Sequence, residues 1–486
     1  MRLSSLLSQT GLSLTVRGNS DPIITGITDD SRKCKTGFLF AAIPGSEHDG
    51  RAFIPQACAA GASAILSTPD ISIPEDIAYV SSETPRRDIA LLAARFSGLQ
   101  PDHIVAVTGT NGKTSTVDFI RQIQTLRGRH AVSLGTLGLR PEISLPVSFP
   151  YLTTPDPITL AAGLSALRQA GITDVAMEAS SHGLDQCRLD GVDIKAAGFT
   201  NLTRDHLDYH GNMDAYRNAK LRLFDTLLPE HGLAAANADM DTTTLEALRE
   251  IASRRSLNLR LVGENGSDIR LLEYIPRPEG QLLKLETSFG RTEILLKLPG
   301  RFQADNVLLA AALCDENEQA LPEILSLLPQ LTGVPGRLEH VLDRPEGAAA
   351  YVDFAHTPDA LTRALNSLRP HASGRLIVVF GAGGNRDKGK RPLMAAAAAA
   401  AADIVIVTDD NPRHEAPDAI RKDVMAGAPD ALEIGDRRKA MGEALSMIRC
   451  GDVLLVAGKG HEQGQIIGSE IFPFDDASVL RELAGE

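Results

Sequence analysis

An apolar segment followed by a glycine-rich turn constrains the fold of this chain more than any other feature. Residues 103–120 read HIVAVTGTNGKTSTVDFI, so a short apolar run leads into two glycines and then into a helix-forming segment. Gly109 and Gly112 let the backbone pass close to an anion, and the first turn of the new helix directs free N–H groups at it. The segment therefore predicts a strand, a phosphate-binding loop and a helix.

The side chains of this loop indicate a nucleoside triphosphate. Lys113 is expected at the β- and γ-phosphates, and the Thr114 hydroxyl is expected to bind Mg²⁺. The strict Walker pattern has a glycine where this chain has Val107, so the loop is a shortened one and a generic kinase or GTPase is disfavoured. The expected ATP contacts in this segment are Gly109, Thr110, Asn111, Gly112, Lys113, Thr114 and Ser115.

Length, charge and cysteine usage exclude several classes of protein. The 486 residues suggest about three domains. A formal net charge of −13 disfavours nucleic-acid partners, and no stretch reaches the ~20 apolar residues of a membrane span. The five cysteines are scattered without a C-x-x-C pair, which predicts reduced cytosol and no zinc site. We therefore expect a cytoplasmic protein with neither nucleic-acid nor membrane partner, and a monomer by default.

The order of apolar runs predicts an α/β protein of three domains. Residues 1–99 suggest a small α/β domain whose polar centre, residues 25–53, is a candidate ligand surface. Residues 100–335 repeat strand, loop and helix, which predicts a mainly parallel, P-loop-type sheet with helices on both faces. Residues 336–486 contain four apolar strands with charged loops, which suggests a Rossmann-like α/β domain. There the eight alanines 395–402 are expected to form a helix covering the sheet.

Polar residues follow the predicted central strands, and ligands of such sheets lie beyond the carboxyl ends of the strands. Glu178 follows DVAM, His206 follows FTNLT, and Lys220 lies on the helix DAYRNAKLRLF. Glutamate and histidine side chains can bind or position a divalent ion beside ATP phosphates. We expect these three residues to lie near Thr114.

Other loops carry groups that suit anionic and zwitterionic substrates. TTPD at 153–156 and SSHGLDQCR at 180–188 gather hydroxyls, an amide and a guanidinium, although turns and helix caps use the same residues. GAGGN at 381–385 does not complete a dinucleotide fingerprint, so NAD or FAD is disfavoured. A cage of guanidinium and carboxylate groups for an amino acid is expected from Arg386, Asp410, Asn411, Arg413 and Glu462.

Taken together, the motifs resemble those of the Mur ligases, ATP-dependent enzymes that add amino acids to peptidoglycan precursors. The matching motifs occur in the family's order along nearly the whole chain. They are GTNGKT (109–114), TTPD (153–156), MEASSHGL (177–184), NLTRDHLDYHG (201–211), GRFQADN (300–306), GRLE (336–339), DFAHTPD (353–359), DDNPR (409–413) and AGKGHE (457–462).

The resemblance implies a ligase that uses ATP and Mg²⁺ to join meso-diaminopimelate to UDP-N-acetylmuramoyl-L-Ala-D-Glu through an acyl phosphate. The DDNPR variant is associated with diaminopimelate, whereas lysine-adding relatives differ at Arg413. The resemblance implies domains at 1–99 for the UDP substrate, 100–335 for ATP and 336–486 for the amino acid. An L-lysine-adding homologue, a folylpolyglutamate synthase-like ligase, a silent scaffold and a P-loop switch protein are the alternatives.

The resemblance also implies roles for individual residues. Lys113, Glu178, His206 and Lys220 are implied as catalytic, and Thr114 joins the last three at the metals, with Lys220 as a carbamate. Asn306, Arg337 and Asp353 are implied at the adenine nucleotide. The UDP substrate is assigned to Ser31, Thr153, Thr154, Ser180, Gln186 and Arg188. Diaminopimelate is assigned to Arg386, Asp410, Asn411, Pro412, Arg413, Gly458 and Glu462. Phe354 and Gln303 depart from the family's usual Tyr and Asn, which affects only local nucleotide contacts.

Overall fold

The chain folds into two compact units, each described by itself. The structure, a computed structural model, describes residues 1–8, 15–17, 21–45, 49–69, 71–74, 76–277, 280–317, 319–344 and 347–485. The first unit is Met1–Ser267 with Leu309–Ala320, and the second is Asp268–Leu308 with Leu321–Glu486. Within the described ranges, no helix combines the length and apolar character of a membrane span.

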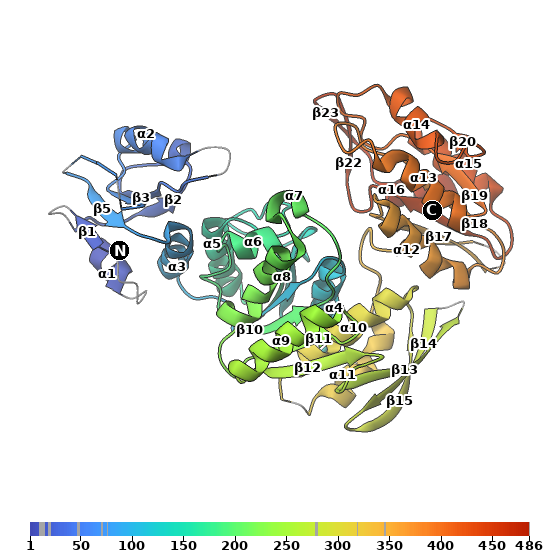
Figure 1. Cartoon of the computed structure of the whole chain (residues 1–486), viewed down its shortest axis with the longest axis horizontal. Coiled ribbons are helices and arrows are strands. Elements are labelled where there is room, and N and C mark those ends of the chain that lie inside the picture. Colours follow the sequence, from blue (N-terminus) through green and yellow to red (C-terminus); the bar gives the residue numbers. More distant parts are fainter. Residues whose placement is uncertain are drawn as a thin grey trace. The chain divides into compact units, whose positions relative to one another are not determined.

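A small sheet forms the N-terminal part of the first unit (Figure 1). Its strands pair in the order β1 (Thr15–Arg17), β5 (Ala78–Ser81), β4 (Ala64–Ser67), β3 (Phe38–Ala41) and β2 (Gly26–Thr28), and only the β1 pairing is antiparallel. Its helices are α1 (Leu3–Ser8), α2 (Ile54–Ala59) and α3 (Pro85–Ser97). Both faces are apolar, since Leu39 and Phe40 alternate between two buried clusters. The predicted polar centre, 25–53, belongs here, and its residues 46–48 lie outside the described ranges.

The second sheet of the first unit is mainly parallel, as expected. Its strands pair in the order β12 (Asn258–Gly263), β11 (Leu233–Asn237), β10 (Ile194–Phe199), β6 (His103–Thr108), β9 (Asp174–Glu178), β7 (Ala131–Gly135) and β8 (Gly138–Arg140). Only the β7–β8 pairing is antiparallel. Its helices are α4 (Lys113–Leu126), α5 (Pro157–Gln169), α6 (Ser181–Asp185), α7 (Leu207–His210), α8 (Met213–Arg222) and α9 (Thr242–Arg254). The carboxyl ends of β6, β7, β9 and β10 therefore share one edge of the sheet.

The second unit begins with three long antiparallel strands and continues into a helical segment. The strands are β13 (Ile269–Arg277), β14 (Gly280–Thr287) and β15 (Gly290–Leu296). Helix α10 (Arg301–Cys314) follows, and its residues from Leu309 onward belong to the first unit. Helix α11 is Leu321–Leu327.

The C-terminal sheet has helices on both of its faces, in orange and red in Figure 1. Its order is β16 (Glu339–Arg344), β17 (Ala348–Asp353), β21 (Val453–Ala457), β18 (Leu376–Phe380), β19 (Ile404–Val407) and β20 (Leu432–Glu433). All neighbours but β16 and β17 are parallel. The helices are α12 (Pro358–Leu368), α13 (Lys390–Ala401), α14 (Pro417–Met425), α15 (Arg437–Met447) and α16 (Asp476–Ala484), and the strands β22 (Gly464–Ile467) and β23 (Glu470–Pro473) form a hairpin.

Alternate residues of β18 point into different cores, as in a sheet that is buried on both faces. Val378 packs in one apolar cluster and Ile377 in the other. The alanine-rich segment forms α13, as predicted, and its Ala395 and Ala398 are fully buried against this sheet. The α/β class with three sheet-based domains is thus confirmed, while the exact domain boundaries remain predictions.

Candidate active site

The predicted phosphate loop lies between β6 and α4. Gly109 and Gly112 have φ of 144° and 85°, a region that glycine adopts without steric cost. A Cβ at Gly109 would lie 1.8 Å from Thr200 Oγ1, so the loop passes directly against the segment that follows β10. The Thr110 N–H donates to Asn201 O at 2.8 Å, which fixes the two segments together.

Thr114 and Glu178, predicted to converge from different elements, are in direct contact. The Thr114 hydroxyl donates to Glu178 Oε1 at 3.0 Å, at the start of α4 and the end of β9. Glu178 is 1% exposed, and the Thr136 N–H donates to the same oxygen at 2.8 Å. A buried hydroxyl and carboxylate beside a phosphate loop are the hard oxygen donors that Mg²⁺ requires, so this pair fits such an ion.

Lys220 is a fully buried lysine beneath the phosphate loop. Its Nζ donates to Gly109 O at 2.8 Å, and Lys113 Nζ donates to the same carbonyl, also at 2.8 Å. Burial lowers the pKa of Lys220 well below its ordinary value, and the neighbouring Lys113 charge lowers it further. The Tyr216 ring lies 4.5 Å from this Nζ. Burial and the Lys113 charge therefore favour the neutral form more strongly in Lys220 than in a solvated lysine.

His206 lies at the same edge but makes different contacts. It is exposed, has a φ of 50°, and its Nε2 lies 3.4 Å from Asp205 Oδ2. Its ring centroid is 5.0 Å from that of His182 and 6.2 Å from that of Tyr216. Over the described part of the chain, His206 has no hydrogen bond or ion pair with Thr114 or Glu178.

Most residues predicted for the UDP substrate form one network in the first unit. Arg188 Nη2 donates to Gln186 Oε1 at 2.7 Å, and Arg188 Nη1 donates to Thr154 O at 2.7 Å. The Ser180 N–H donates to Thr154 Oγ1 at 3.0 Å. Burial lowers the pKa of Arg188.

The remaining two UDP-substrate residues have other partners. The Thr153 hydroxyl lies 3.1 Å from that of Thr136, a residue that also contacts Glu178. Ser31 is buried in the N-terminal sheet domain, where its hydroxyl donates to Gln56 Oε1 at 2.9 Å. Ser31 therefore does not belong to the Arg188 network.

Residues predicted for the amino acid gather at the carboxyl edge of the C-terminal sheet. Asn411 Nδ2 donates to Glu462 Oε2 at 2.8 Å, which joins the loop after β19 to the loop after β21. Arg413 has a φ of 52°, and its Nη1 donates to Gly384 O at 3.0 Å, in the loop after β18. A Cβ at Gly458 would lie 2.7 Å from Asp410 Oδ2, so these two positions are also close.

Pro412 and Arg386 complete that predicted set. Pro412 is buried between Asn411 and Arg413, and a Cβ at Gly384 would lie 1.8 Å from its carbonyl oxygen. Arg386 is exposed and forms no hydrogen bond or ion pair with the residues that the structure describes. The arrangement has cationic and anionic groups on loops from three adjacent strands, as a zwitterion requires.

Predicted nucleotide residues of the second unit also lie close to one another. Arg337 lies over the Phe354 ring at 4.7 Å, and its carbonyl accepts from Gln303 Nε2 at 3.0 Å. Asn306 Nδ2 lies 3.4 Å from Gln303 Oε1. Burial raises the pKa of Asp353, although Arg337 and backbone N–H groups oppose this effect. The two departures from the family pattern, Gln303 and Phe354, thus contact Arg337 directly.

Comparison with known proteins places these clusters in a family. The Mur ligase middle domain model matches residues 107–314, the Mur ligase glutamate ligase domain model matches 336–460, and the Mur ligase family catalytic domain model matches 23–109. A UDP-N-acetylmuramoyl-L-alanyl-D-glutamate--2,6-diaminopimelate ligase of Caulobacter vibrioides is 51% identical over 96% of each chain. The chain belongs to the Mur ligase family.

Further relatives agree with this assignment. A ligase of the same name from Agrobacterium fabrum is 48% identical to this Mur ligase, over 95% of this chain and 94% of the relative. A solved structure of a 2,6-diaminopimelate ligase of that name matches with a TM-score of 0.72 at 33% identity, over 95% of each chain. A folylpolyglutamate synthase of Mycobacterium tuberculosis shares the fold, with a TM-score of 0.59 at 18% identity over 77% of this chain and 91% of its own.

Three residues of this Mur ligase escaped the sequence-based prediction although they contact predicted ones. Thr136 contacts Glu178, Tyr216 contacts Lys220, and Lys459 Nζ lies 3.2 Å from Glu462 Oε2. Tyr216 stands four residues before Lys220 on α8, a helical spacing that could have indicated contact. Lys459 lies within AGKGHE, whereas nothing in the sequence distinguishes Thr136.

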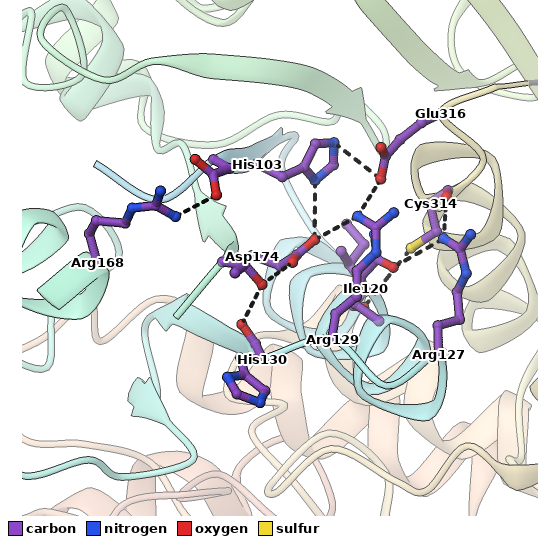
Figure 2. Close-up of polar contacts among 12 residues, drawn as sticks. His103, Ile120, Arg127, Arg129, His130, Arg168, Asp174, Cys314 and Glu316 are labelled. Atoms are coloured by element: carbon purple, nitrogen blue, oxygen red, sulfur yellow. Dashed lines mark hydrogen bonds and ion pairs between the residues drawn. The ribbon is translucent and has the colours of Figure 1, made fainter. Parts of the chain in front are cut away.

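An ionic cluster lies at the amino-terminal edge of the mainly parallel sheet of the first unit, opposite the edge that carries the phosphate loop (Figure 2). Arg129 Nη1 donates to Asp174 Oδ1 at 3.0 Å and to Glu316 Oε1 at 2.6 Å. His103 lies between the same carboxylates, with Nδ1 3.6 Å from Asp174 and Nε2 3.6 Å from Glu316. The atoms of His103, Asp174 and Glu316 that could bind a metal ion all lie within 4.8 Å of one another. Because the Arg129 guanidinium already bonds both carboxylates and neutralises one of their two charges, we interpret the cluster as a ring of ion pairs, not as a metal site.

Proposed function

We propose that this Mur ligase joins meso-diaminopimelate to the D-Glu of UDP-N-acetylmuramoyl-L-Ala-D-Glu, with hydrolysis of ATP to ADP and phosphate. The observation that carries the proposal is the contact of Thr114 with Glu178 beside the phosphate loop, above the buried Lys220. The dipeptide substrate and diaminopimelate are those in the names of relatives that match nearly the full chain. A cytoplasmic location is part of the proposal, because its substrates are nucleotide-linked and soluble, and a monomeric state is kept as the default.

The reaction is proposed in two balanced steps. The γ-carboxylate of the D-Glu attacks the γ-phosphorus of ATP, the bond to the β–γ bridging oxygen breaks, and ADP leaves. The neutral amine of diaminopimelate then attacks the acyl phosphate carbon, phosphate leaves, and the nitrogen loses a proton to form the amide. Both steps need positioning and charge neutralisation, and neither needs a protein nucleophile.

The residues around the loop are proposed to neutralise charge in the first step. Lys113 and the N–H groups at the start of α4 offset the repulsion between the D-Glu carboxylate and the triphosphate. Thr114, Glu178 and His206 are proposed to hold Mg²⁺, which when bound neutralises phosphate charge. Asn306, Arg337 and Asp353 are proposed to hold the adenine nucleotide.

Lys220 is proposed to act as a carbamate, formed when its neutral amine attacks CO2 and loses a proton. An ammonium at this buried position would repel both Lys113 and a metal ion, whereas a carbamate is an anion that attracts them. The low pKa of Lys220 supplies the unprotonated amine that the modification requires.

The remaining predicted residues are proposed to select the two other substrates. Arg188, Gln186, Thr154, Thr153, Ser180 and Ser31 would bind the UDP-linked dipeptide. Arg386 and Arg413 would bind carboxylates of diaminopimelate, while Asp410 and Glu462 would bind its ammonium groups. Asn411, Pro412 and Gly458 would shape this pocket.

The proposal is tested by phosphate release with ATP, Mg²⁺ and UDP-N-acetylmuramoyl-L-Ala-D-Glu, with meso-diaminopimelate or L-lysine as the amine. We expect release with diaminopimelate and at least about tenfold less with lysine, which lacks the second carboxylate that Arg413 would bind. Comparable release with lysine would identify a lysine-adding enzyme. Release with neither, but with a folate and glutamate, would favour the folylpolyglutamate alternative.

A further inference from the structure

Lys459 is a completely buried cation inside the loop that carries Glu462. Its relative exposure is 0%, although a lysine seldom loses all contact with water unless its charge is paired. Its Nζ donates to Gly464 O at 2.6 Å, to Asn411 Oδ1 at 3.1 Å and to Glu462 Oε2 at 3.2 Å. All three hydrogen atoms of the ammonium group are thus used, and two of them go to side chains proposed to bind the amino acid.

These bonds fix the orientation of the Asn411 amide. Its Oδ1 accepts from Lys459 and from the Ile466 N–H at 2.9 Å, so the Nδ2 must point the other way. That Nδ2 donates to Glu462 Oε2. An amide in the flipped orientation would place its NH2 against the Lys459 ammonium and another donor, which is unfavourable.

The same bonds fix the Glu462 carboxylate with one oxygen occupied. Oε2 accepts both from Lys459 and from Asn411, whereas Oε1 has no hydrogen-bond partner in the described part of the chain. The Glu462 side chain is 36% exposed, while Lys459 beneath it has no access to solvent. Glu462 Oε1 therefore remains able to accept a hydrogen bond, while Oε2 is held by Lys459 and Asn411.

We propose that Lys459 is a positioning residue that locks Asn411 and Glu462 in the conformation that receives an ammonium group of the amino-acid substrate. The inference rests on the proposed function, because it assumes that this loop cluster is the amino-acid site. Lys459 does not touch the substrate and takes no part in the phosphate chemistry of the first unit. Its substitution therefore weakens binding of the amino acid, with little effect on binding of ATP.

The test compares Lys459→Met with wild type in the phosphate-release assay, with separate titrations of diaminopimelate, ATP and the UDP-linked dipeptide. Arg375→Gln is the matched control. It removes a cation paired at 2.6 Å with the buried Asp452, but at the amino-terminal edge of the same sheet. We expect the KM for diaminopimelate to rise at least roughly tenfold in Lys459→Met, with the other two KM values within about twofold of wild type. Arg375→Gln is expected to leave all three values near those of wild type.

A double variant separates positioning from general destabilisation. In a Glu462→Gln background, Lys459→Met should raise the KM for diaminopimelate much less than it does alone, because its effect passes through Glu462. Independent, multiplicative effects, or a uniform rise of all three KM values, would overturn the inference. If Lys459→Met does not fold, Lys459→Gln takes its place under the same criteria. Wild type is assayed in parallel and tests the proposed function. If wild type is inactive with diaminopimelate, the proposed function is refuted, and this inference is refuted with it.

Discussion

At the scale of single residues, Lys220 shows how packing decides chemistry. Its buried Nζ shares the Gly109 carbonyl with the partly exposed Lys113, and both burial and the Lys113 charge lower its pKa. Because CO2 reacts with neutral amines, burial would favour the carbamate proposed for Lys220. The sequence alone could not establish that Lys220 is buried, since a lysine on a helix is usually solvated.

We predict a carbamate on Lys220 that is essential for activity. Protein equilibrated with ¹³C-labelled bicarbonate should show a carbamate resonance by ¹³C NMR, and Lys220→Ala should lack this resonance. The variant should lose activity by on the order of 100-fold, the scale on which one well-placed electrostatic group contributes. A wild-type spectrum without the resonance under turnover conditions would refute the modification, and an active Lys220→Ala would refute its role.

At the scale of elements, the phosphate loop depends on a backbone approach that only glycine permits. Gly109→Ala would place a methyl group 1.8 Å from Thr200 Oγ1, so either the loop or the segment after β10 must move. We predict a loss of turnover on the order of 100-fold, since displacement of about 1 Å in a positioning element has effects of that size. Steady-state phosphate release measures the loss, and calorimetry of ATP binding should show weakened affinity.

Gly128→Ala is the control for the backbone conformation itself. Gly128 follows the other end of α4, has a φ of 80°, and a Cβ there would meet no atom within 4 Å. This variant should lose about 1–2 kcal/mol of stability from its left-handed backbone, with turnover intact. Equal losses of turnover in both variants would mean that strain in the helix, and not the loop contact, limits the reaction.

Much of this element-level arrangement was predictable, and the exceptions have a physical cause. Parallel strands place their carboxyl ends together, so the sequence predicted the contact of Thr114 with Glu178 and the gathering of Asn411 with Glu462. The family assignment, the ligase class and the α/β fold are confirmed. The individual roles of the site residues remain predictions. Contacts such as Thr136 with Glu178 depend on loop conformation, which no periodicity encodes.

At the scale of the whole molecule, the ring of His103, Asp174, Arg129 and Glu316 joins segments that are far apart in the sequence. It links the starts of β6 and β9 with the loop after α4 and the segment after α10 (Figure 2). None of the family motifs contains these residues, so the ring could not be predicted from the sequence. Burial lowers the pKa of His103 below its ordinary 6.5, although Glu316 and Asp174 oppose this effect. Charges of His103 and Arg129 hold the pKa of Glu316 below its ordinary value, against the effect of burial.

Both shifts make the fold less stable in acid. A histidine with a lowered pKa binds its proton more readily in the unfolded chain, so its contribution is complete above the unfolded value of about 6.5 and is lost as pH falls. For Glu316 the contribution is present above its ordinary 4.5 and disappears at lower pH still. We therefore predict that the melting temperature of wild type falls more between about pH 7.5 and pH 5.5 than that of His103→Gln, by a few degrees. The step isolates the histidine, because it ends above the range in which the glutamate titrates.

His340→Gln is the control, since His340 is an exposed histidine of the second unit. It should show the same acid sensitivity as wild type, because His340 lies outside the ring, pairing with Asp343 instead, and its substitution leaves the contacts of His103 intact. Calorimetric melting curves over the pH series, without substrates, separate this stability effect from titration of the active site. A His103→Gln variant whose melting temperature follows wild type at every pH would show that the ring tolerates a protonated imidazole. In that case the two carboxylates, which carry one negative charge more than Arg129 neutralises, would stabilise the protonated His103. Their attraction for the imidazolium would then exceed the free-energy cost of its desolvation.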